Sequence, residues 1–228
     1  MDITAWLVYF SETLLLIILA APVIAAPAYT EGVDYTRLSN AIRNEPAIAQ
    51  LNANNPNKVQ LLLFFSFGCP ACAKFEPIFE RWENKQNNSK LVIYREPVSF
   101  EDDWEDLAKL YYVEQNLKPH KNLNEKIFKG IHEQDLKLWH ESDMEEFFVS
   151  QGYTADAVKT LYNSYEIDTQ AKQADALAKA YNINQTPSIV INGTDAMYLL
   201  TVDKAGGDRD KMMKIADYLI AVETKKLK

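Results

Sequence analysis

The chain has 228 residues and a formal net charge of −8, and 47% of its residues are hydrophobic, a composition typical of a globular protein with room for one domain and a smaller insert. Basic residues form no dense run apart from the tail at 225–228, which argues against a nucleic-acid-binding surface. An acidic balance of this size keeps a protein dispersed in water and indicates no particular partner.

The first residues have the composition of a targeting segment. An unbroken apolar run from Leu14 to Ala21 is followed by the small-residue cluster Ala25–Ala28, a pattern that predicts a secretory signal peptide over 1–26. No Lys or Arg precedes the run, which departs from the usual signal peptide. The alternative is an uncleaved membrane anchor, because the stretch 3–26 just reaches the length of a membrane span. The short apolar run favours cleavage.

A strand, a helix and a second strand are predicted next. The segment 58–67 is apolar almost throughout, as expected of a central strand buried on both faces, and Gly68 ends it. Pro70 suits a first helical position, and Pro77 should kink the amphipathic helix that follows. A short strand over Lys90–Arg95 completes a crossover, so the two strands should be parallel.

No convincing strand occurs over 99–165, where helical periodicity recurs instead. We interpret this stretch as a helical insert, with polar capping residues at Ser142-Asp143 and Thr154. The predicted helices of the insert are Trp104–Leu117, Leu123–Ile131, Met144–Gln151 and Ala155–Ser164.

The chain returns to strands after the insert. An alanine-rich helix over Thr169–Tyr181 precedes Thr186-Pro187 and a β-branched strand that ends in the turn Asn192-Gly193. An edge strand over Met197–Thr201 should complete a hairpin. A glycine pair and Asp208 then cap a last amphipathic helix.

The only two cysteines of the chain lie in the tetrapeptide Cys69-Pro70-Ala71-Cys72. Two cysteines placed at random would show this spacing about once in a hundred chains, and so short a loop gives little structural stabilisation as a disulfide. At the start of a helix, the first sulfur faces backbone N–H groups and the positive end of the helix dipole, which stabilise a thiolate. Cys69 is therefore the predicted nucleophile. Cys72, one turn later on the same side, is the predicted resolving cysteine.

The segment Phe64–Pro77 resembles the active-site segment of DsbA-type thiol-disulfide oxidoreductases. The order of strand, helix and insert is similar to that family's plan, and the stretch 142–193 resembles its passage from late insert to cis-proline strand. The resemblance implies an α/β thioredoxin fold with an inserted all-helical domain. In this division, 27–98 and 166–228 form the thioredoxin domain and 99–165 form the insert.

The resemblance also implies the activity. It predicts periplasmic oxidation of cysteine pairs in exported proteins by the Cys69/Cys72 disulfide, without a bound cofactor, and reoxidation by a DsbB-type membrane quinone reductase. Thr186-Pro187 matches the family's cis-proline loop beside the sulfurs, although most X-Pro bonds are trans. Glu76 matches an acid beneath the buried sulfur. Compensation of the helix dipole at the surface is the commoner role for such a residue.

One position departs from the family pattern. Its best-known members have a histidine where this chain has Ala71. Without that hydrogen-bond donor, the pKa of Cys69 should be less depressed and the disulfide less oxidising, although the helix dipole should keep the pKa below that of a free thiol. The departure keeps disulfide reduction or isomerisation open as an alternative.

Two other classes of function compete with redox exchange. Paired thiols can hold zinc or copper, but His120, His132 and His140 all fall in the insert and have no ligand spacing to the cysteines, so we expect no metal site and interpret them as surface or capping residues. A redox-inert module that binds unfolded clients would use the same apolar surface. No heptad run predicts a dimerisation stalk, so a monomer is expected.

Overall fold

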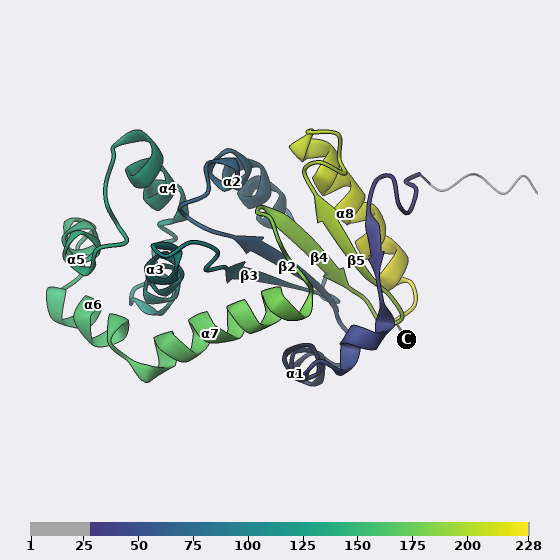
Figure 1. Ribbon diagram of the computed structural model, residues 1–228, viewed down its shortest axis with the longest axis horizontal. Coiled ribbons are helices and arrows are strands. Elements are labelled where there is room, and N and C mark those ends of the chain that lie inside the picture. The colour runs from purple at the N-terminus through teal and green to yellow at the C-terminus, as the bar shows by residue number, and fades with distance from the viewer. Residues whose placement is uncertain (1–27, 228) are drawn as a thin grey trace, which may run out of the picture.

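The computed structural model describes residues 28–227, so the predicted signal peptide lies outside the described residues. Its centre is a five-stranded mixed sheet of order β1-β5-β4-β2-β3 (Figure 1). β2 and β3 are parallel, and the other neighbouring strands are antiparallel. The strands are β1 Thr36–Leu38, β2 Val59–Phe65, β3 Leu91–Pro97, β4 Ser188–Asn192 and β5 Met197–Thr201.

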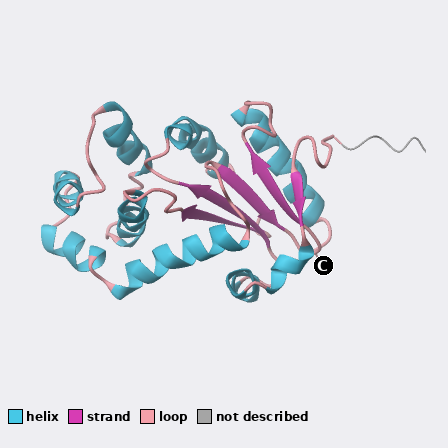
Figure 2. Cartoon of the chain, viewed as in Figure 1, coloured by secondary structure: helices cyan, strands magenta, loops and turns pink. Residues whose placement is uncertain are grey.

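Helices cover both faces of the sheet and extend beyond one side of it (Figures 1 and 2). α2 and α8 lie on one face, α1 and α7 lie on the other, and α3 to α6 gather beyond β3. No helix of the described chain has the length and apolarity to cross a membrane. The helices are η1 Asn40–Asn44, α1 Pro46–Asn54, α2 Pro70–Glu83, α3 Trp104–Asn116, α4 Asn124–Glu133, α5 Glu141–Ser150, α6 Ala155–Tyr162, α7 Tyr165–Ala180 and α8 Arg209–Thr224.

The central strand β2 is buried along its whole length, as its apolar sequence predicts. Leu61, Leu63 and Phe65 point into a core shared with α2, α8 and the insert. Leu62 and Phe64 point into a second core, formed with α1 and α7. The alternation of strand side chains thus joins both layers of helices to one strand, and the strand carries the active-site turn at its carboxyl end.

The predicted parallel crossover and the hairpin of β4 and β5 are confirmed. The prediction that Met197–Thr201 is an edge strand is wrong, because β1 pairs with β5 from Thr36↔Leu199 to Leu38↔Met197. β1 has only three residues. A strand this short produces no recognisable alternation in the sequence.

The four helices predicted in the insert all form, and α7 follows them directly. The predicted cap at Thr154 is confirmed, since its side chain accepts a hydrogen bond from Ala157 N. The cap at Ser142-Asp143 is wrong, because α5 begins one residue earlier, at Glu141. α7 begins at Tyr165, ahead of the predicted Thr169, because Ser164 caps it. The domain boundaries stay a prediction, since α7 contacts both α3 and β3.

Candidate active site

The chain leaves the sheet at the end of β2 and enters α2 through a tight turn at Gly68. Cys69 is the N-cap residue and Pro70 takes the first helical position, where a missing N–H costs nothing. The Ser66 carbonyl accepts a hydrogen bond from Cys69 N (3.1 Å), and the Cys69 carbonyl accepts one from Cys72 N (3.0 Å). A Cβ on Gly68 would lie 2.5 Å from Trp104 Nε1, so any larger residue here would require the Trp104 side chain to move.

The structure brings the two thiols together with the Thr186-Pro187 loop. The exposed fraction is 7% for Cys69 and 2% for Cys72, and both are free thiols. Cys69 Sγ lies 3.5 Å from the Thr186 carbonyl oxygen, although the two residues are 117 positions apart. The Thr186-Pro187 peptide bond is cis, as the resemblance predicted.

The two thiols differ strongly in acidity. A hydrogen bond from the Cys72 thiol is the largest effect on Cys69 and lowers its pKa to about 5 against the opposing effect of burial, with smaller contributions from Thr186 and from the N–H groups of Cys72 and Ala71. Burial, together with the neighbouring sulfur, raises the pKa of Cys72 well above its ordinary value. At neutral pH the site therefore holds a Cys69 thiolate and a Cys72 thiol. The sequence predicted that the pKa of Cys69 lies below that of a free thiol, and the structure agrees with this direction. The sequence did not predict that the Cys72 thiol would be the main hydrogen-bond donor to Cys69.

Glu76 lies one turn after Cys72 and is 3% exposed, so the alternative of a surface residue that compensates the dipole is wrong. Both of its oxygens accept hydrogen bonds from Arg95 Nη1 at 2.8 Å, and Arg95 Nη2 also pairs with Glu83 at 2.8 Å. Burial raises the pKa of Glu76, and the charge of Arg95 opposes that rise. Sequence reasoning missed Arg95. Its only signal was its position at the end of the short strand predicted over Lys90–Arg95.

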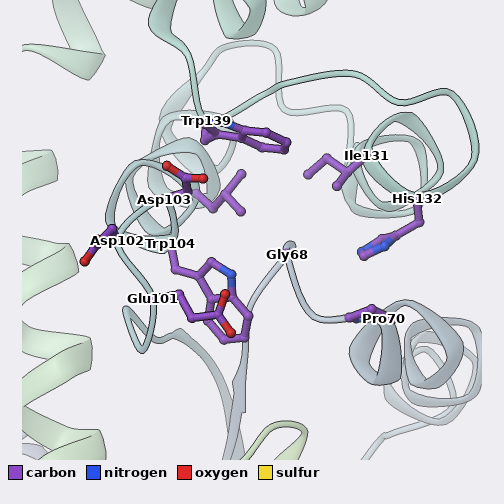
Figure 3. A pocket seen from close by; sticks show the side chains of 10 residues that line it. Gly68, Pro70, Glu101, Asp102, Asp103, Trp104, Ile131, His132 and Trp139 are labelled. Carbon is purple, nitrogen blue, oxygen red and sulfur yellow. The ribbon is translucent and has the colours of Figure 1, made fainter.

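A cavity of about 510 Å³ opens beside the active-site turn, between the thioredoxin part and the insert (Figure 3). Three consecutive acids lie on one side of it, and two tryptophans and a histidine are among its other lining residues. Its lining residues are Gly68, Pro70, Glu101, Asp102, Asp103, Trp104, Leu107, Ile131, His132 and Trp139.

The three histidines have different surroundings, which the sequence did not distinguish. His132 is half-buried and lies beside Pro70 in the cavity, so its interpretation as a surface or capping residue is wrong. His120 lies 3.2 Å from the buried carboxylate of Glu114. His140 is exposed and precedes α5 without a capping hydrogen bond from its side chain.

A dithiol of unequal acidity at a helix N-terminus, held beside a cis-proline on this sheet, defines a thiol-disulfide oxidoreductase of thioredoxin fold. Comparison with known proteins agrees, since the thioredoxin family matches residues 51–206. The chain is 30% identical to the thiol:disulfide interchange protein DsbA of Bordetella parapertussis, over 95% of this chain and 98% of that one. It is 28% identical to DsbA of Pseudomonas aeruginosa, over 87% of each chain.

Solved structures lead to the same family. The crystal structure of Pseudomonas aeruginosa DsbA superimposes with a TM-score of 0.75 at 28% identity, covering 87% of this chain and 96% of that one. The chain belongs to the DsbA family of thiol:disulfide interchange proteins within the thioredoxin superfamily. Its chemistry is thiol-disulfide exchange.

Proposed function

We propose that the protein is a periplasmic oxidase that introduces disulfides into exported, cysteine-containing proteins through a Cys69–Cys72 disulfide. The observation that carries the proposal is the buried dithiol at the start of α2, where Cys69 Sγ lies 3.5 Å from the Thr186 carbonyl oxygen and the Cys72 thiol lowers the pKa of Cys69 to about 5. A stabilised thiolate favours the reduced protein, so the corresponding disulfide readily accepts electrons from a client dithiol. The DsbA name of the relatives supports the same direction.

Two exchange steps transfer two electrons. A client thiolate attacks Sγ of Cys69, the Cys69–Cys72 bond breaks, and Cys72 leaves and takes up a proton, since burial raises its pKa. The second client thiolate then attacks the client sulfur of the mixed disulfide, and Cys69 leaves as its stabilised thiolate. The client gains a disulfide and the protein ends as the dithiol. A DsbB-type membrane quinone reductase would reoxidise it.

The surroundings of the sulfurs fit these roles. The Thr186 carbonyl oxygen lies 3.5 Å from Cys69 Sγ, so an extended client could pair with the main chain of this loop while the client sulfur is bound to Cys69. Pro70 and Ala71 begin the helix, which presents the N–H group of Ala71 to the thiolate. Glu76 would act as a proton acceptor only with Arg95 in place as its partner.

A weaker oxidant or a reductase is the second candidate, and Ala71 favours it. A thiol pKa of about 5 lies between the values of roughly 3.5 and 7 found for a strongly oxidising DsbA and for thioredoxin. The absence of a histidine in the tetrapeptide fits this intermediate acidity.

The reduction potential tests the proposal. Equilibration with glutathione should give a value between roughly −270 mV, as for thioredoxin, and −120 mV, as for DsbA, and nearer to the latter. A reduction potential at or below that of thioredoxin would overturn the proposed oxidase function.

Two serine variants test the roles of the sulfurs. Cys69→Ser should abolish dithiol oxidation, whereas Cys72→Ser keeps the nucleophile and should accumulate mixed disulfides with disulfide-containing clients. Unchanged client binding by Cys69→Ser, together with no oxidation by the wild type, would favour a redox-inert binding module instead.

A further inference from the structure

His132 extends from α4 of the insert to the chain segment that enters the active-site turn. Its Nε2 lies 2.7 Å from the Phe67 carbonyl oxygen, and its ring stacks on Phe128 with ring centroids 6.2 Å apart. A carbonyl oxygen only accepts hydrogen bonds, so Nε2 carries the proton and donates. Stacking and hydrogen bond together hold the imidazole against the turn.

The peptide unit between Phe67 and Gly68 depends on this histidine. It lies beyond the last residue of β2, and in the described chain no backbone N–H donates to the Phe67 carbonyl. Its other polar atom, Gly68 N, donates to Ser66 Oγ at 3.1 Å. The side chains of Ser66, in the same turn, and of His132, on α4, thus occupy both polar atoms of the unit that immediately precedes Cys69. A buried carbonyl without its donor would be costly.

The orientation of this unit affects the sulfur. Cys69 follows it directly, and the Cys69 thiolate is stabilised by the Cys72 thiol and by N–H groups of the first helical turn. Those donors are effective only when the turn presents the sulfur to them, because hydrogen bonds weaken steeply with misalignment. Close packing of Gly68 against Trp104 leaves little room for another arrangement.

We infer that His132 is a positioning residue for thiol-disulfide exchange: by donating Nε2–H to the Phe67 carbonyl, it fixes the turn that presents Cys69 to its thiolate donors. The inference rests on the proposed function of the Cys69/Cys72 pair. It assigns the helical insert a part in the active site. It also places an imidazole beside the turn of a chain whose tetrapeptide has Ala71 instead of histidine.

Three full-chain variants test the inference. His132→Ala removes the donor, whereas His132→Gln keeps an N–H donor at the ε position but has no ring and no charge. His140→Ala is the matched control, an exposed histidine of the same insert. The measurements are the glutathione equilibrium, the pH titration of thiolate absorbance, and the rate of oxidation of a dithiol peptide, with thermal unfolding of each variant to establish that it is folded.

His132→Ala should lower the acid dissociation constant of Cys69 by about fivefold, and the equilibrium constant for oxidising glutathione by about the same factor. A change of about fivefold corresponds to the net free energy of one hydrogen bond. This corresponds to a reduction potential lower by about 20 mV. His132→Gln should remain within about twofold of the wild type, as should His140→Ala.

Three results would overturn the inference: an unchanged His132→Ala protein, equal losses in His132→Ala and His132→Gln, or an equal loss in His140→Ala. Equal losses in both His132 variants would mean that the ring or its charge acts, and not the hydrogen bond. Failure of the proposed function is distinguishable, since the wild type itself would then not oxidise the peptide.

Discussion

Replacing Arg95 with methionine removes the counter-charge of the buried carboxylate on α2. Arg95 is 7% exposed and pairs with Glu76, which is 3% exposed, and with Glu83 at the edge of the core. Its guanidinium carbon also lies 4.8 Å from the ring centroid of Phe79. Methionine keeps most of the apolar volume, so the loss reports mainly on the charge. Removing one partner of a buried ion pair costs about 3–5 kcal/mol.

The pH dependence of the defect identifies its cause. Burial already raises the pKa of Glu76 above its ordinary value of 4.5, and the loss of Arg95 should raise it further. An acid whose pKa is higher in the folded than in the unfolded state binds more protons when folded, so stability falls as pH rises through that window. The Arg95→Met defect should therefore be smallest at low pH, where Glu76 is protonated, and grow as pH rises above about 4.5.

Thermal and denaturant unfolding measure the effect. For a chain of this size, 3–5 kcal/mol lowers Tm by about 6–20 °C. Adding Glu76→Gln to the variant should restore part of the stability, because a neutral amide costs less to bury than an unpaired charge. Arg81→Met, at an exposed arginine of α2, the helix that carries Glu76, is the control. A loss below about 1 kcal/mol, or an equal loss in the control, would refute the reasoning.

Two further predictions concern acidity. Cys72→Ala should raise the pKa of Cys69 from about 5, whereas Cys72→Ser keeps a hydroxyl donor and should leave it low; equal titration curves of thiolate absorbance would contradict this. Burial raises the pKa of Glu96, 7% exposed, to about 7, so its contribution to stability falls between about pH 4.5 and 7. The free energy of unfolding of Glu96→Gln, relative to that of the wild type, should therefore rise by up to about 3 kcal/mol between low pH and pH 8. A difference in unfolding free energy that does not change with pH would contradict this prediction.

Much of the local structure is encoded locally. The apolar run ending at Phe67, the glycine after it and the proline at the first helical position were enough to predict β2, the turn and α2, because strand burial and helix initiation depend on neighbouring residues. The cysteine spacing predicted redox exchange by the same kind of argument. The cis peptide bond at Thr186-Pro187 needed the family resemblance, since sequence alone favours trans.

By itself, the sequence determined the strands and helices from β2 onward and the two side chains that carry the chemistry, whereas β1, η1 and α1 were not predicted. Only the tertiary structure decided what surrounds the sulfurs: the Thr186 carbonyl at Cys69, Arg95 at Glu76 and His132 at Phe67. The two residues of each pair are 117, 19 and 65 positions apart in the sequence, respectively. Hydrophobic periodicity indicates which face of an element is buried, but it carries no information on which distant side chain packs against that face.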